Sequence, residues 1–193
     1  MAEVTFENKT VIVTGGGNGL GKAYSLDMAS RGAKVVVNDL GGAVDGSGSG
    51  NTPADEVVNE IIANGGEAVA NYDSVATKEG GESIVQTAID NFGTVDAIVN
   101  NAGILRDKSF ANMSEEELSL IIDVHLKGTF YVSQPAFKVM KENAYGRIVN
   151  VASPSGLFGN FGQSNYGAAK MGIVGLTNVL AIEGAKYNIK VNV

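Results

Sequence analysis

Short runs of apolar, mostly β-branched residues alternate along the chain with longer segments that repeat apolar positions at helical spacing. Short apolar runs bounded by glycine or polar residues predict strands buried on both faces, as in a parallel sheet. The longer segments predict helices that pack on such a sheet. The expected strands are residues 10–13, 34–38, 67–71, 95–99, 147–151 and 189–193, and the expected helices are 19–30, 52–64, 83–91, 115–142 and 165–186.

Local signals mark several ends of these elements. Pro53 suits the first turn of a helix, where its missing N–H costs nothing. Ser114 and Glu117 have the spacing of a capping box at the start of the long helix, and Pro135 predicts a kink within it. The segment 41–50 is rich in glycine and serine, which predicts a mobile loop after the second strand.

The alternation of strands and helices predicts an α/β protein with a doubly wound parallel sheet, arranged as three layers with helices on both faces. A chain of 193 residues is long enough for one such domain and short for two. Its last segment predicts a sixth strand with no helix after it to cover it. We therefore expect residues 1–193 to form a single domain that is truncated at its C-terminus.

Composition and charge narrow the possible partners. The formal net charge is −7, which argues against nucleic acid or an anionic membrane as a partner. The chain has no cysteine and one histidine, so we expect no disulfide and no metal site. Residues 1–9 lack the apolar core of a secretory signal, and no window approaches the ~18 apolar residues of a membrane span. We expect a reducing, aqueous compartment.

A glycine-rich turn, Thr-Gly-Gly-Gly-Asn-Gly-Leu-Gly at 14–21, follows the first strand and opens the first helix. Glycines let the backbone approach a pyrophosphate closely, and the helix start supplies free N–H groups and the positive end of the dipole. The alternative is a turn that serves only helix–strand packing. The candidate cofactor-binding residues of this turn are Gly15, Asn18, Gly19, Leu20 and Gly21.

Asp39 closes the second strand, about twenty residues beyond the glycine turn. A carboxylate at this place can accept hydrogen bonds from both hydroxyls of a ribose, and it would repel a 2′-phosphate. It therefore favours NAD over NADP as the cofactor. The alternative is a solvated carboxylate in a loop.

Tyr166 and Lys170 lie four residues apart on a predicted helix, so both side chains project from one face. An ammonium ion held beside a phenol favours the phenolate, which would make Tyr166 an acid or base for a hydroxyl or carbonyl group. Ser153, thirteen residues upstream, follows the fifth strand and could hold the substrate oxygen near Tyr166. The alternatives are a surface lysine beside a surface tyrosine and an ordinary loop serine.

Taken together, the glycine turn, the Asn-Asn-Ala-Gly at 100–103, Ser153, Tyr166 and Lys170 resemble the short-chain dehydrogenase/reductase family, which has a Rossmann fold. The resemblance covers all 193 residues. It implies that Lys170 binds the nicotinamide ribose and that the remaining strand ends also contact the cofactor. These further cofactor-binding candidates are Asp73 and Ser74 beside the adenine, and Asn101, Ala102 and Gly103 in a tight turn, where a simple turn or cap is the alternative.

His125 departs from the family pattern. Most members have an asparagine at this position, which supports a water in a proton relay to the lysine. A lone histidine in a helix can also be a buried core residue. The substitution could weaken the relay, or the imidazole could serve it in place of asparagine, so His125 is a further catalytic candidate.

Five stretches resemble one subgroup of this family: 36–42, 70–75, 101–107, 124–128 and 159–163. The subgroup comprises the (3R)-hydroxyacyl-CoA dehydrogenase domains of peroxisomal multifunctional enzymes and their bacterial relatives. It implies NAD-dependent oxidation of a (3R)-hydroxyacyl thioester to the 3-ketoacyl thioester. The alternatives are 3-ketoacyl reduction with NADPH, oxidation of another secondary alcohol, and a non-catalytic NAD-binding module.

The family resemblance also implies a homodimer or homotetramer, paired through the helix 115–142 and the helix that bears Tyr166. An apolar face of the second helix fits this pairing and fits sheet packing equally well. Its residues are Ile173, Leu176, Thr177 and Leu180. The acidic composition suggests a bacterial cytoplasm, whereas eukaryotic members of the subgroup are peroxisomal.

Overall fold

The computed structural model describes residues 4–193 and contains one six-stranded parallel sheet with the order β3-β2-β1-β4-β5-β6. The predicted doubly wound α/β fold is confirmed. The expectation about a signal at residues 1–9 falls partly on residues 1–3, which lie outside the described part. The strands are β1 (Thr10–Thr14), β2 (Lys34–Asn38), β3 (Glu67–Asn71), β4 (Ala97–Asn100), β5 (Gly146–Asn150) and β6 (Ile189–Asn192).

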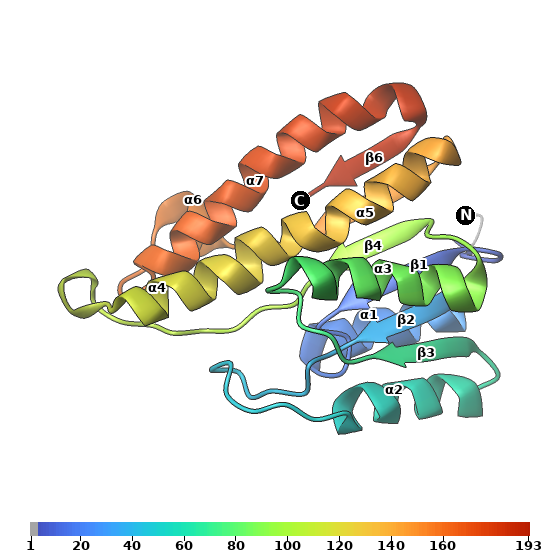
Figure 1. The fold of residues 1–193 in the computed structure, drawn as a ribbon, viewed down its shortest axis with the longest axis horizontal. Helices are drawn as coiled ribbons and strands as arrows, with labels where there is room; N and C mark the ends of the chain where they lie inside the picture. Colours follow the sequence, from blue (N-terminus) through green and yellow to red (C-terminus); the bar gives the residue numbers. More distant parts are fainter. Residues whose placement is uncertain (1–3) are drawn as a thin grey trace.

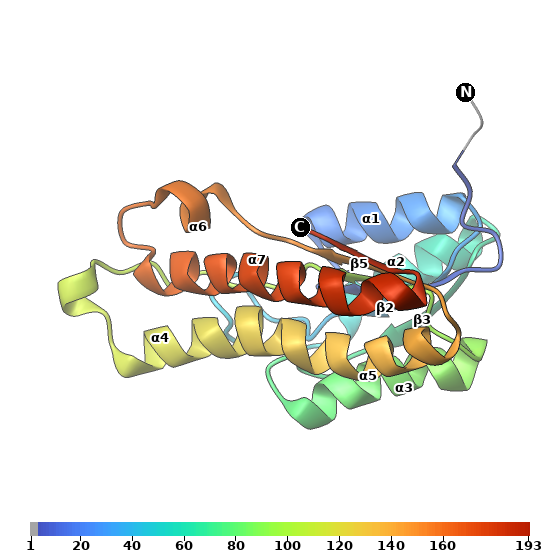
Figure 2. The same cartoon turned by 90° about the horizontal axis from the view of Figure 1, so that it is seen from above.

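Helices cover both faces of the sheet (Figures 1 and 2). Residues 115–142 form one long rod, from the start of α4 to the end of α5, and this rod runs beside α7 in both views. Helices α1 and α2 pack on one face, and α3, α5 and α7 pack on the other. No helix within residues 4–193 has the length and hydropathy to cross a membrane. The helices are α1 (Gly19–Ser30), α2 (Thr52–Ala63), α3 (Lys78–Phe92), α4 (Glu115–Ile121), α5 (Gly128–Glu142), α6 (Pro154–Phe158) and α7 (Ser164–Gly184), with short 3-10 turns η1 (Phe110–Asn112) and η3 (Ala185–Tyr187).

The core is divided by the sheet, because successive strand residues point to opposite faces. Ile12 and its register partner Ile98 point toward α3 and α5 together with Ile148 of β5. Val11 and Val13 point the other way and pack with residues of α1 and α2. All five of these side chains are buried. Such two-sided burial explains why the strands are continuous apolar runs rather than alternating ones.

Helix α3 begins at Lys78, five residues before the predicted start, so this boundary was predicted wrongly. Gly80 and Gly81 lie in its first turn. Glycine has a low helix propensity, so the local sequence does not predict a helix there. A Cβ on Gly80 would overlap the carbonyl oxygen of Ser74, and one on Gly81 would overlap that of Tyr131 in α5. Gly80 therefore lets the first turn of α3 lie against the preceding loop, and Gly81 lets α3 approach α5 closely. These tertiary contacts outweigh the low helix propensity of the two glycines.

The predicted helix 115–142 is continuous in space but changes its hydrogen-bonding pattern. The capping box of Ser114 and Glu117 is present at the start of α4, as expected. A π-helical segment, η2 (Ile122–Lys127), separates α4 from α5. Pro135 lies inside α5, which continues as α-helix on both sides of it. The irregular segment is therefore η2 rather than the surroundings of the proline.

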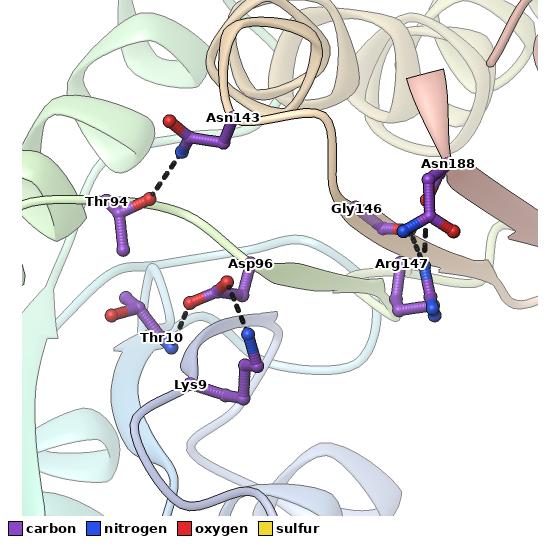
Figure 3. A network of polar contacts seen from close by, with 8 residues as sticks. All are labelled: Lys9, Thr10, Thr94, Asp96, Asn143, Gly146, Arg147 and Asn188. Atoms are coloured by element: carbon purple, nitrogen blue, oxygen red, sulfur yellow. Dashed lines mark hydrogen bonds and ion pairs between the residues drawn. The ribbon is translucent and has the colours of Figure 1, made fainter. Parts of the chain in front are cut away.

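A polar network joins the amino-terminal ends of several strands (Figure 3). The Asp96 carboxylate accepts a hydrogen bond from the Thr10 N–H at 2.9 Å and pairs with the Lys9 ammonium at 3.2 Å. The Arg147 side chain donates to the carbonyl oxygen of Asn188 at 2.9 Å, which links the starts of β5 and β6. These contacts hold together the edge of the sheet opposite the carboxyl ends of the strands.

At the carboxyl edge, five strands end in asparagine, and all but Asn192 of β6 have a buried side chain. The four buried strand-end asparagines are Asn38, Asn71, Asn100 and Asn150. They pair side by side across the sheet: the Asn38 amide donates to the Asn71 side chain at 2.9 Å, and the Asn100 amide donates to that of Asn150 at 2.8 Å. The pairs fix the level at which the strands stop and the functional loops begin.

Candidate active site

The predicted site residues follow the carboxyl ends of five neighbouring strands. The order of the sheet reverses between β1 and β4, because β1 leads outward to β2 on one side and β4 leads to β5 on the other. In open α/β sheets this switch point is where ligand crevices form. The glycine turn follows β1 there, and the turn that begins at Asn101 follows β4.

The glycine turn is held tightly by its neighbours. Gly15 has φ +62°, and a Cβ on it would lie 2.9 Å from the Cα of Ala102. A Cβ on Gly21 would overlap the Gly15 carbonyl oxygen. The Asn101 amide donates to the carbonyl oxygens of Thr14 and Gly15, both at 3.1 Å. The turn after β4 therefore supports the glycine turn from below.

The outer part of the turn is open. Gly19 has φ +51°, and no atom lies within 4 Å of the place its Cβ would occupy. Asn18 is the N-cap residue of α1 and makes no side-chain capping bond, and Leu20 is exposed. The first N–H groups of α1 thus have no side-chain cap, an arrangement that suits a phosphate group. This fits the predicted pyrophosphate site.

Asp39 lies against the glycine turn. Its Oδ2 accepts a hydrogen bond from the Gly17 N–H and its Oδ1 accepts one from the Gly41 N–H, each at 2.8 Å. The carboxylate is fixed at the end of β2 beside the helix start, about where a ribose attached to a bound pyrophosphate would lie. The same two bonds bring the start of the 41–50 loop next to the glycine turn.

The remaining cofactor candidates serve mainly to shape the loops. The Asp73 carboxylate accepts hydrogen bonds from the side chains of Asn71 and Ser83, and the Ser74 hydroxyl accepts one from the Ala76 N–H. The N–H groups of Asn101 and Ala102 both donate to the Thr14 hydroxyl at 3.1 Å. Any contact of Asp73 and Ser74 with an adenine would therefore compete with existing partners or use the backbone.

Gly103 completes this turn for a reason that only the structure reveals. A Cβ at this position would overlap the imidazole ring of His125. Glycine is needed here so that the helix carrying His125 can approach the end of β4.

Lys170 is nearly buried on α7, with 4% of its surface exposed. Its ammonium donates to the Val151 carbonyl oxygen at 2.6 Å and lies 5.5 Å from the centre of the Tyr166 ring. Burial lowers the pKa of Lys170 from 10.5 to about 8. The predicted pairing of Tyr166 and Lys170 on one face of a helix is what the structure shows.

His125 lies in η2 and is buried, with 3% of its surface exposed. Its ring packs edge-on against Tyr166, with the ring centres 5.0 Å apart. Nε2 lies 2.8 Å from the carbonyl oxygen and 3.1 Å from the nitrogen of Ile104, so either tautomer finds a partner there. Burial, and then the charge of Lys170, lower the pKa of His125 from 6.5 to about 4.

Ser153 is the N-cap residue of α6, a short helix that the sequence did not predict. Its hydroxyl accepts a hydrogen bond from the Ser155 N–H at 3.2 Å. The turn packs directly on the helix of Tyr166, because a Cβ on Gly156 would come within 3.2 Å of the Lys170 backbone. Ser153 thus belongs to the same corner of the molecule as Tyr166 and Lys170.

The strand-end asparagines are part of the site that the sequence reasoning missed. Asn150 donates to the Thr177 hydroxyl of α7 at 2.8 Å, which fixes this helix against the end of β5. A signal was present, because two predicted strands end in Asn38 and Asn71, and Asn100 and Asn150 lie within one residue of the ends of two others. Within residues 4–193, no cluster of three metal-ligating side chains occurs.

The parallel sheet, the glycine turn at its switch point and the Tyr166–Lys170 pair are features found in nicotinamide-dependent oxidoreductases of the α/β class. A family model described as short chain dehydrogenase matches residues 9–193. The chain belongs to the short-chain dehydrogenase family.

The similar proteins include larger ones. The chain is 60% identical over 189 residues to the peroxisomal hydratase-dehydrogenase-epimerase of Saccharomyces cerevisiae, covering 98% of this chain and 21% of that protein. It is 57% identical over 187 residues to the peroxisomal multifunctional enzyme type 2 of Mus musculus, covering 97% and 25%. A crystal structure of a short chain dehydrogenase from Mycobacterium avium matches with a TM-score of 0.91 at 47% identity, covering 98% and 67%. The chain thus spans about a quarter or less of the two multifunctional relatives.

The burial of His125 predicts how stability depends on pH. Because its pKa is about 4 in the folded protein and 6.5 ordinarily, the unfolded chain binds more protons between these values. The free energy of unfolding is therefore not reduced by His125 above pH 6.5, and it decreases as the pH falls from 6.5 toward 4. A His125→Asn variant lacks this loss, which is on the order of 3 kcal/mol. Urea unfolding of both proteins across this range measures it, and parallel curves would contradict it.

Proposed function

We propose that this protein is an NAD-dependent dehydrogenase that oxidises a (3R)-hydroxyacyl thioester to the 3-ketoacyl thioester. The observation that carries the proposal is the buried ammonium of Lys170, 5.5 Å from the ring of Tyr166. The similarity to a hydratase-dehydrogenase-epimerase and to a multifunctional enzyme type 2 supports a dehydrogenase of the subgroup that the five sequence stretches resemble, and the thioester is the substrate that this resemblance implies. Residues 1–193 would form one NAD-binding domain of this enzyme.

In this proposal Tyr166 acts as the general base. As phenolate it takes the proton of the substrate hydroxyl, and Ser153 holds the same oxygen by a hydrogen bond. NAD, when bound, supplies the acceptor for the hydride that leaves the carbinol carbon. A positioned general base contributes about 10²–10⁴-fold to the rate.

Lys170 stabilises the phenolate by its positive charge. An ammonium in a poorly solvated place interacts strongly with a nearby anion, because little water screens the pair. Its other proposed partner is the nicotinamide ribose. The bond to the Val151 carbonyl oxygen holds the amine at the end of β5, where it can reach both groups.

NAD is proposed rather than NADP because of Asp39. Short-chain dehydrogenases use either nucleotide, and the choice depends on the residue that meets the 2′ position of the adenosine ribose. Two backbone N–H groups fix the Asp39 carboxylate beside the glycine turn. Its negative charge would repel a 2′-phosphate there.

The function is tested by NADH formation in the full-length protein with (3R)- and (3S)-hydroxyacyl-CoA, with NADP as the control cofactor. We expect turnover of only the 3R isomer, and only with NAD as the cofactor. NAD binding without turnover of either isomer would point to another alcohol or to a non-catalytic module.

A Tyr166→Phe variant should lose about 10²–10⁴-fold in kcat, because it lacks the general base. Near-normal turnover by the Tyr166→Phe protein would refute the assignment.

An Asp39→Ala variant should keep its fold and lose its preference for NAD over NADP in the same assay.

We propose that His125 takes the role of the family's asparagine in a proton relay to Lys170. Its Nδ1 is buried and has no hydrogen-bond partner in the described part of the chain, so it can bind a water. The Lys170 charge contributes to the lowered pKa of the imidazole, so the two groups interact electrostatically. A residue that only filled the core would not need this free nitrogen.

Two variants separate the relay from packing. His125→Asn supplies an amide in place of the imidazole, so kcat should stay within about threefold. His125→Leu fills similar space without polar atoms and should lower kcat by roughly tenfold or more at neutral pH. Equal activity in both variants, measured in the same NADH assay, would leave His125 as a core residue.

We also propose that the protein forms a homodimer through α5 and α7. Of the face that the sequence suggested, Ile173 and Thr177 are buried, whereas Leu176 and Leu180 line an apolar groove along α5 and α7. The volume of this groove is about 650 Å³. Among its lining residues are Leu126, Phe130, Phe137, Gly172, Gly175 and Val179.

A charge in this groove should separate the subunits. Val179 is 51% exposed there, so Val179→Asp leaves the core intact and places a charge where a second copy would pack. The matched control is Ile62→Asp on α2, which is 54% exposed and far from the groove along the sheet. Sedimentation velocity should show a monomer for Val179→Asp and the parent assembly for Ile62→Asp. An unchanged assembly in both would exclude this interface.

We propose that the protein is located in the peroxisome. The yeast and mouse relatives are named peroxisomal proteins, which supports the peroxisome over the cytoplasm among the two expected locations.

A further inference from the structure

Asn165 immediately precedes Tyr166, and its side chain is among the most buried polar groups of the protein, with 1% of its surface exposed. Its amide nitrogen donates one hydrogen bond to the Arg106 carbonyl oxygen at 3.1 Å and one to the Glu117 carbonyl oxygen at 2.9 Å. Its Oδ1 accepts a hydrogen bond from the Tyr166 N–H at 2.7 Å. Both hydrogens and the oxygen of the amide are therefore used.

These bonds join three segments that are distant in sequence. Arg106 lies in the segment after β4, Glu117 lies in the first turn of α4, and Asn165 lies in the first turn of α7. The first turn of a helix has N–H groups with no partner inside the helix. The N-cap residue of α7, Gln163, makes no side-chain capping bond. Asn165 supplies an acceptor from inside the helix and ties the same turn to two other segments.

The segment to which Asn165 is tied is itself fixed from the other side. Ile104 meets the imidazole of His125, the Leu105 N–H donates to the Val44 carbonyl oxygen at 2.9 Å, and the Arg106 side chain donates to the carbonyl oxygen of Asp45. The 41–50 loop thus holds this segment in place through hydrogen bonds to Leu105 and Arg106. Asn165 transmits that fixed position to the backbone of Tyr166.

We propose that Asn165 is a positioning residue for Tyr166, and the proposal rests on the catalytic role of Tyr166 proposed above. The ring of Tyr166 must lie between the ammonium of Lys170 and the substrate hydroxyl. Lys170 is held at β5 by Val151, so it does not follow a shift of the first turn of α7. Without Asn165 that turn can move relative to the lysine. A displacement of about 1 Å in a catalytic group can cost on the order of 10²-fold in rate.

The test compares Asn165→Ala and Asn165→Asp with Asp96→Ala in the full-length protein, by NADH formation and NAD titration. Asn165→Asp is nearly isosteric, keeps the acceptor for the Tyr166 N–H and loses both donors. Asp96→Ala removes the hydrogen bond from the Thr10 N–H and the ion pair with Lys9, at the edge of the sheet opposite the site. It should lower Tm without moving Tyr166.

Both Asn165 variants should lose at least about tenfold in kcat, with the Kd for NAD within about twofold of the parent value. The pH profile of kcat/KM should also shift, since Tyr166 and Lys170 are no longer in register, whereas Asp96→Ala should keep the parent kcat and profile. Parent kcat and pH profile in Asn165→Ala, or an equal loss in Asp96→Ala, would overturn the proposal.

Hydrogen exchange gives a readout that does not need turnover. Amides around Tyr166 and in residues 104–108 should exchange faster in both Asn165 variants and at the parent rate in Asp96→Ala. Unchanged exchange at these amides would overturn the proposal even if kcat fell. If the parent protein oxidises no hydroxyacyl thioester, the proposed function fails, and the exchange rates show separately whether Asn165 holds Tyr166 in place.

Discussion

Buried polar side chains at the carboxyl edge of the sheet constrain everything that lies above them. A buried amide without a partner costs about 1–3 kcal/mol, so each strand-end asparagine must find one. Asn38 pairs with Asn71, and Asn100 pairs with Asn150, which in turn holds Thr177 of α7. These requirements align the ends of neighbouring strands. The glycine turn, the carboxylate of Asp39 and the helix of Tyr166 all start from that common level.

The free-energy cost of burying a charge also determines which of His125 and Lys170 is protonated. Two cations side by side in a poorly hydrated corner would repel each other, and burial disfavours both. His125 accordingly has the lower pKa, about 4, while that of Lys170 is about 8. At neutral pH one positive charge remains, next to the ring of Tyr166. The neutral imidazole supplies hydrogen-bonding capacity there without adding a competing charge.

Much of this arrangement could be predicted from sequence, because two-sided burial and glycine boundaries are local signals. The ranges of α1, β2 and β3 agree with the prediction, and Tyr166 and Lys170 share a helix face as expected. The early start of α3 could not be predicted, since it depends on the tertiary contacts of Gly80 and Gly81, and no local signal in the sequence marks the π-helical form of η2. The partner of His125, Ile104, is 21 residues away and follows from the fold alone.

The π-helical segment η2 also sets the rotational phase of the long rod. Each π-helical turn includes one more residue than an α-helical turn, so the residues of α5 are turned by about 100° from where an unbroken α-helix would place them. Helix α4 can therefore present the Glu117 carbonyl to Asn165 while α5 presents Phe130 to the outer groove. The rod thus forms both the contact with Asn165 and one wall of the groove, which lie at different angles around its axis. Removing one residue from η2 would preserve the composition of both surfaces and destroy their alignment.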